Sequence, residues 1–170
     1  MRFFTLFLII FPIIITANKN KIQLSPQLKN SYLKLLDQAS AFHKALRLGD
    51  KNNIQKEIKQ TQEIIAELYR KSSSLSEFHF RIHSYKLLKS IEEQLSMITH
   101  NHLLKENQEK KVVKRLFNSF FELAQVYNLT KDMKAKVFYC GKDKSLWFQT
   151  DRKAQNPINP GYKNCATQVL

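Results

Sequence analysis

The two cysteines are the residues whose type and spacing suggest chemistry most directly. The chain has 170 residues and only two cysteines, Cys140 and Cys165, which stand 25 positions apart. Two cysteines in an oxidising compartment most often form a disulfide. A disulfide that closes a loop of this length stabilises the folded state by about 3–4 kcal/mol, because it lowers the entropy of the unfolded chain. Two thiolates beside a histidine or methionine can instead hold a soft ion such as Cu(I). A reduced, unpaired state is the third alternative.

Two histidines form a second candidate metal site. His79 and His83 are four residues apart, which places them one turn apart on the same side of a helix, a spacing that can chelate Zn²⁺ or Cu²⁺. The alternative is that both are ordinary residues at the edge of an apolar stripe. His100 and His102 stand near a predicted helix end and can bind a metal or interact with the negative helix C-terminus. His43 has no partner nearby in the sequence.

Signatures of catalysis are missing from the sequence. It contains no glycine-rich phosphate loop, no Gly-x-Ser-x-Gly elbow and no Cys-x-x-Cys-His motif. Acidic residues are scarce, with 14 Asp and Glu against 28 Lys and Arg, and none forms an evident catalytic pair. The only foothold for acid–base chemistry is Glu77 beside His79 and His83. We therefore expect no catalytic residues and a protein that is not an enzyme.

The first residues have the order of a secretory signal peptide. Arg2 precedes an apolar run over residues 3–15, and Ala17 is a small residue suited to the last position before cleavage. The alternative is an uncleaved anchor, but a run of about 13 residues is short of the roughly 20 that span a bilayer. We expect residues 1–17 to be removed and 18–170 to form one secreted or periplasmic domain without a transmembrane segment.

The charge of the chain restricts its partners. The formal net charge is +14, which favours attraction to anionic lipid headgroups, cell-wall polymers or an acidic protein. The alternative is that the lysines only solvate exposed helix faces. Export would separate the chain from nucleic acid, so no nucleic acid is expected among its partners.

Four amphipathic segments predict the elements that position these residues. Their apolar residues recur every three and four positions, which is typical of helices with one buried face. The three glycines and four prolines of the chain are few, which also favours long helices. The predicted helices cover residues 26–48, 51–70, 76–100 and 106–128. Short connections between them predict an all-α fold, an antiparallel four-helix bundle.

The residues after Thr130 have a different pattern. Residues 136–140 and 146–149 are short, aromatic and β-prone, and the polar residues 141–144 between them predict a turn. We expect a small hairpin and loop, at about 131–170, that caps the bundle and is anchored by Trp147 and Phe148.

The order of residues in this tail resembles that of a known family. A tyrosine–cysteine pair is followed by a tryptophan, an Asn-Pro turn and a final cysteine, namely Tyr139, Cys140, Trp147, Asn156, Pro157 and Cys165. This order is similar to the pattern Tyr-Cys-Pro-Met, Trp-Leu, Asn-Pro-Tyr and Met-x-x-Cys-Gly of the bacterial domain of unknown function 3347. That family occurs as small exported proteins and fused to periplasmic adaptor subunits of copper and silver efflux systems.

The resemblance implies a periplasmic binding protein linked to heavy-metal handling, with a metal-efflux adaptor as partner. A copper or zinc ion would then be held by Cys140, Cys165, His79 and His83. The chain departs from the pattern because Lys142 and Tyr162 stand where the family has methionines. Both soft thioethers are therefore missing, and the Lys142 ammonium would repel a cation, so we expect weak or absent metal binding at the tail. The alternative function is a structural or interaction protein that docks on an anionic envelope component through its basic surface.

Overall fold

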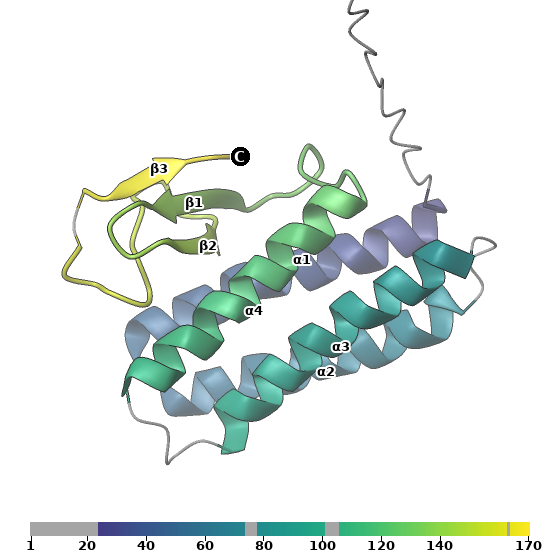
Figure 1. Cartoon of the computed structure of the whole chain (residues 1–170), viewed down its shortest axis with the longest axis horizontal. Helices are drawn as coiled ribbons and strands as arrows, with labels where there is room; N and C mark the ends of the chain where they lie inside the picture. The colour runs from purple at the N-terminus through teal and green to yellow at the C-terminus, as the bar shows by residue number, and fades with distance from the viewer. Residues whose placement is uncertain (1–23, 74–77, 101–105, 163) are drawn as a thin grey trace, which may run out of the picture.

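The structure is a computed structural model that describes residues 24–73, 78–100, 106–162 and 164–170. In these residues four long helices are followed by a small antiparallel sheet of three strands (Figure 1). The elements are α1 (Pro26–Leu48), α2 (Lys51–Ser72), α3 (Phe78–His100), α4 (Glu106–Val126), β1 (Lys136–Cys140), β2 (Ser145–Gln149) and β3 (Ala166–Gln168). None of the described helices is both long and apolar enough to cross a membrane. The predicted signal peptide, residues 1–17, lies outside the described residues.

Short-range signals set the helix ends. Ser25 accepts a hydrogen bond from the backbone N–H of Leu28 at 3.3 Å, and Pro26 occupies the first turn of α1, where its missing N–H costs nothing. Gly49 ends α1 in the left-handed conformation with φ 63°, and its N–H bonds to the carbonyl of Leu46. Asp50 caps α2 immediately afterwards. The sharp connection between α1 and α2 follows from these residues.

The predicted helix bounds need two small corrections. The helix α2 continues to Ser72 instead of ending at 70, and α4 ends at Val126 instead of 128. The earlier end of α4 has a local cause, because Asn128 adopts a positive φ of 51° and the N–H of Leu129 turns back to the carbonyl of Ala124 at 2.8 Å. The predicted start of the third helix, residues 76–77, lies outside the described residues.

The prediction of an all-α fold is only partly right, because the cap is a sheet. The hairpin of β1 and β2 forms as predicted, with Phe138 opposite Trp147. A third strand then pairs with the other edge of β1, so that the strand order is β2-β1-β3. The strand β3 has only three residues, too few to show a period in the sequence, and it lies beside β1 because Cys165 is joined to Cys140.

The four helices divide into a layer that carries the sheet and a layer that does not. The strand β2 packs against α1 and α4, whereas α2 and α3 lie on the far side of the bundle (Figure 1). Apolar positions of all four helices form one continuous core with the sheet, and it includes Leu35, Ile65, Leu88 and Phe117.

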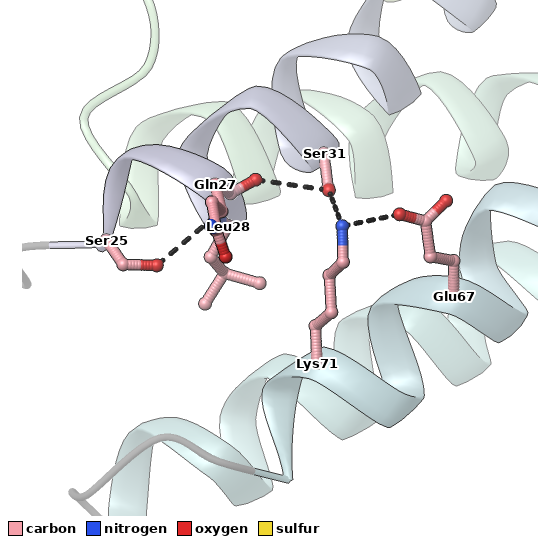
Figure 2. A network of polar contacts seen from close by, with 6 residues as sticks. All are labelled: Ser25, Gln27, Leu28, Ser31, Glu67 and Lys71. Carbon is pink, nitrogen blue, oxygen red and sulfur yellow. Dashed lines mark hydrogen bonds and ion pairs between the residues drawn. The ribbon is translucent and has the colours of Figure 1, made fainter.

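A polar network fixes the start of α1 against the end of α2 (Figure 2). The ammonium of Lys71 donates to Ser31 at 3.0 Å and forms an ion pair with Glu67, while Ser31 donates to the carbonyl of Gln27 at 3.2 Å. Surface ion pairs contribute only about 0–1 kcal/mol. The network therefore contributes little to the free energy of folding, and its main effect is to fix the position of one helix end relative to the other.

Every residue of β2 is buried, although β2 is an edge strand. Alternate side chains of a strand point to opposite faces, and here each face has its own cover. Phe148 faces the bundle, with ring centroids 6.5 Å from Phe117 and 6.2 Å from Phe120. Trp147 lies on the other face and stacks on Phe138 at 6.0 Å. The cap is thus held to the bundle mainly by aromatic packing.

We expect Phe148→Ala to lower the free energy of unfolding by about 3–5 kcal/mol, because truncating a buried aromatic ring leaves a cavity. Urea unfolding at neutral pH would measure the change. Tyr139→Ala on the neighbouring strand is the matched control, since Tyr139 is exposed, and it should cost less than about 1 kcal/mol. Equal losses in the two variants would contradict this account of how the cap is attached.

Candidate functional site

The two cysteines are joined in the structure. Cys140 is the last residue of β1 and Cys165 immediately precedes β3, and their sulfur atoms are bonded at 2.20 Å. Cys140 is fully buried. Because a sulfur in a disulfide is not a thiolate, neither cysteine offers a metal ligand in this state.

The predicted metal residues are not brought together by the fold. His83 lies half-buried on α3, which packs on α2 and α4, while the cysteines lie in the sheet beside α1 and α4. The side chain of His79 is outside what the structure describes, as are those of Glu77, His100 and His102. In the part of the chain that is described, no three His, Cys, Asp or Glu side chains are grouped so that they could hold a metal ion.

The two residues that replace the methionines of the family pattern do meet. The ammonium of Lys142 lies 5.9 Å from the centroid of the Tyr162 ring, a distance at which a cation is attracted to an aromatic face. The chain therefore has a cation on a ring where the family pattern would place two thioethers.

The amide of Gln149 organises the loop that covers β2. Its oxygen accepts hydrogen bonds from Nε1 of Trp147 and from the backbone N–H of Gln155, both at 3.0 Å. Its nitrogen donates to the backbone carbonyls of Asp151, at 3.1 Å, and Lys153, at 2.5 Å. Gln149 is fully buried, so all of its polar atoms are used to hold residues 151–155 over the sheet.

The carboxylate of Asp143 holds the next part of the same loop. It accepts hydrogen bonds from Ser145 and from the side-chain amides of Asn156, at 3.0 Å, and Asn159. Burial alone would raise the pKa of Asp143, but these hydrogen bonds lower it below its usual value. The oxygen of Asn156 in turn accepts from the backbone N–H groups of Ile158 and Asn159, which forms a tight Asx-type turn at Pro157.

Two side chains from the end of α1 complete the attachment of the loop. His43 contacts the carbonyl of Gln155 through Nε2 at 2.8 Å, and Arg47 donates through Nη1 to the side-chain oxygen of Gln155. Burial lowers the pKa of His43, and the positive charge of Arg47 lowers it further, against the opposing effects of the Gln155 carbonyl and Asp151. His43 is therefore neutral at neutral pH and donates its Nε2 proton to the carbonyl.

A cleft of about 570 Å³ opens between the end of α1 and the loops of the cap. We name it the cap cleft, and its lining residues are Arg47, Lys153, Ala154, Gln155, Asn156, Pro160, Tyr162, Asn164 and Ala166. Among these residues there are two cations and three side-chain amides but no carboxylate. Such a lining can bind a carboxylate or phosphate group through charge-assisted hydrogen bonds.

The sequence pointed to part of this site. Trp147 was predicted to anchor the cap and Asn156 to form a turn of the tail. Both are buried, and both belong to the hydrogen-bond network behind the cleft. Tyr139 is exposed on β1 and lines neither the cleft nor the network. Arg47 and Gln149 were not identified, because their partners are fixed by the packing of the tail on α1 and no local motif marks them.

No protein-family model matches the chain, and no curated protein or solved structure shows significant similarity to it. The resemblance to domain of unknown function 3347 therefore stays a prediction.

We expect His43 to make the fold sensitive to mild acid. Its pKa is lowered in the folded protein, so the unfolded chain, with a histidine pKa of about 6.5, takes up the proton first as the pH falls. The stabilising effect of neutral His43 is therefore complete when the pH is above the pKa of histidine in the unfolded chain. It is lost progressively as the pH falls below that pKa. His43→Gln keeps a neutral donor, so urea unfolding from pH 7.5 to 5 should show a smaller loss of stability than in the unmodified protein. An unchanged acid slope in this variant would assign the effect to other groups.

Proposed function

We propose that this chain is an exported, non-enzymatic binding protein that engages an anionic group of a cell-envelope component in the cap cleft. The observation that carries the proposal is the lining of the cleft, which includes Arg47, Lys153 and three side-chain amides and in which no described residue is acidic. The formal net charge of +14 would add long-range attraction to the same class of partner.

The rigidity of the cleft supports a binding role. Its wall is fixed by Gln149 of β2, by Asp143 in the turn between β1 and β2, and by His43 of α1. A site whose donors are already in place loses little side-chain freedom when a ligand binds. The disulfide between Cys140 and Cys165 serves the same purpose, because it fixes the start of β3, whose first residue, Ala166, lines the cleft.

The chemistry of the cleft favours an anion over a metal ion. Lys142, held over Tyr162, adds a third positive charge close to the cleft, since Tyr162 lines it. Copper-type metal handling with an efflux adaptor as partner, which the resemblance implies, stays a prediction. It would require reduction of the bond between Cys140 and Cys165 before either sulfur could act as a thiolate ligand.

The proposal can be tested by removing the cleft cations and titrating a defined polyanion. We expect Arg47→Gln with Lys153→Gln to weaken binding of poly-L-glutamate and of polyphosphate about tenfold or more at physiological salt, since hydrogen bonds between charged groups contribute about 1.5–3 kcal/mol each. Isothermal titration calorimetry would measure both affinities. Lys153→Gln alone should give part of the loss without touching the network, because the Lys153 side chain is exposed.

The matched control removes the same charge elsewhere. Lys56→Gln with Lys59→Gln takes two positive charges from the exposed surface of α2, a helix that contributes no described residue to the lining of the cap cleft. This control should change affinity about twofold or less, because exposed charges are screened within about 8 Å at physiological salt. Equal losses in the two double variants would mean that the basic surface binds diffusely and that the cap cleft is not the site.

A further inference from the structure

A second concave site lies at the opposite layer of the bundle. It has a volume of about 520 Å³ and lies between the last turns of α2 and the first half of α3. We name it the α2–α3 groove. Its walls and rim include Tyr69, Ile82, Tyr85, Arg81, Lys86 and Lys89. The groove is separate from the cap cleft, because in the described residues neither α2 nor α3 contacts the sheet.

The walls of the groove are apolar side chains that the core does not use. Ile82 and Tyr85 are 39% and 53% exposed, whereas Leu88 and Ile91 on the same helix are fully buried in the bundle. The ring of Tyr85 meets that of Tyr69 with centroids 5.3 Å apart and planes inclined by 44°. Exposed apolar side chains gathered in a concave site mark a binding surface more often than chance exposure.

The charged residues that the structure describes in the lining of the groove are all positive. Arg81, Lys86 and Lys89 have exposed side chains on α3. Two described carboxylates outside the lining contact residues of the groove: Glu93 is 4.0 Å from Lys89, and Glu92 accepts a hydrogen bond from the hydroxyl of Tyr69 at 3.3 Å. Burial and the Glu92 charge raise the pKa of Tyr69, so its hydroxyl adds no negative charge.

Buried hydroxyl groups hold the groove open from below. Ser72 lines the groove and is itself buried, and its hydroxyl contacts that of Tyr32 on α1 at 3.1 Å and that of Ser84 on α3 at 3.4 Å. Tyr32 and Ser84 are also hydrogen-bonded to each other. These contacts join α1, α2 and α3 at one level of the bundle, directly beneath the groove.

We propose that the α2–α3 groove binds a single-chain anionic lipid, with its acyl chain against Tyr69, Ile82 and Tyr85 and its headgroup at Arg81, Lys86 and Lys89. Charge complementarity selects the headgroup, because the described residues that line the groove include three cations and no acid. The apolar walls exclude sugars and polyanions, which would leave these side chains in water. The volume is that of a pocket for one small molecule, within the usual 300–1,000 Å³, so the occupant is one lipid molecule and not a bilayer surface.

The experiment compares two lipids that differ only in headgroup charge. Lysophosphatidylglycerol and lysophosphatidylcholine with the same acyl chain would be titrated into the full protein below their micelle-forming concentrations. Isothermal titration calorimetry should show one site, with the anionic lipid bound about tenfold more tightly or better, as expected for one or two charge-assisted contacts. Vesicles containing phosphatidylglycerol form a third arm, which separates capture of single lipids from attachment to a membrane.

Variants assign the binding to the groove. Ile82→Ser with Tyr85→Ser should weaken binding of both lipids about tenfold or more, and Lys86→Gln with Lys89→Gln should remove the preference for the anionic one. Met97→Ser is the matched control, because Met97 is a similarly exposed apolar residue of α3 that does not line the groove, and its affinities should be unchanged. All these residues are exposed, so far-ultraviolet circular dichroism should show intact helices.

Three outcomes would overturn the proposal. Equal affinity for the two lipids would show that the cations do not recognise a headgroup. Binding to vesicles without binding of the free lipid would make the groove a membrane-contact surface. Loss of lipid binding in the cap-cleft variant Lys153→Gln, without loss in the double variant Ile82→Ser with Tyr85→Ser, would place the lipid at the cap cleft. The same comparison separates failure of this proposal from failure of the proposed function.

Discussion

The burial of β2 on both faces is the constraint on which the rest of the cap depends. An edge strand normally presents unpaired backbone groups and one wet face to solvent, yet every residue of this strand is buried. Phe148 satisfies one face by packing against α4, and the loop held by Gln149 and Asp143 covers the other. Burying an aromatic side chain stabilises the folded state by roughly 1.5–3 kcal/mol. This is more than an exposed ion pair contributes, such as that between Lys71 and Glu67. Aromatic packing therefore holds the cap on the bundle more strongly than any of these ion pairs, and the polar network directs the path of the loop.

The cap cleft is a by-product of this covering loop. The loop crosses from the sheet to the end of α1 and covers Trp147, and on this path Lys153 comes to line the same cleft as Arg47. The two concave sites thus arise from different features of one molecule. The cap cleft is formed by a loop that is fixed to the end of α1. The α2–α3 groove is formed by two helices that are joined through buried hydroxyl groups.

Local patterns in the sequence predicted the helices and the hairpin, since these elements depend on residues close together in the chain. Three signals predicted both ends of α1 to the residue. They are the spacing of its apolar residues, Ser25 followed by Pro26 at its start, and Gly49 after its last residue. The strand β3 could not be predicted, because three residues carry no period and only the pairing with β1 defines them. The expected all-α class was for this reason only partly right.

The candidate site was harder to predict than the fold. The contact between His43 and Gln155 joins residues 112 positions apart, and no spacing within either segment signals it. Trp147 and Asn156 stood out because of their residue types, which indicated importance but not their partners. The metal set expected from the cysteines and histidines combined residues that the fold places on different helices and strands, a separation that a linear pattern does not reveal.

The position of α1 also has a consequence for how the chain reaches its folded state. This helix forms at the beginning of the described chain, yet part of its packing surface is covered only by β2, about a hundred residues later. Until the tail docks, Phe117 and Phe120 on α4 and the neighbouring face of α1 are left without their cover. A bundle whose tail had not docked would expose these apolar surfaces, and partly folded chains with exposed apolar surface associate with one another. Rapid closure of the tail would accordingly protect newly made molecules from aggregation.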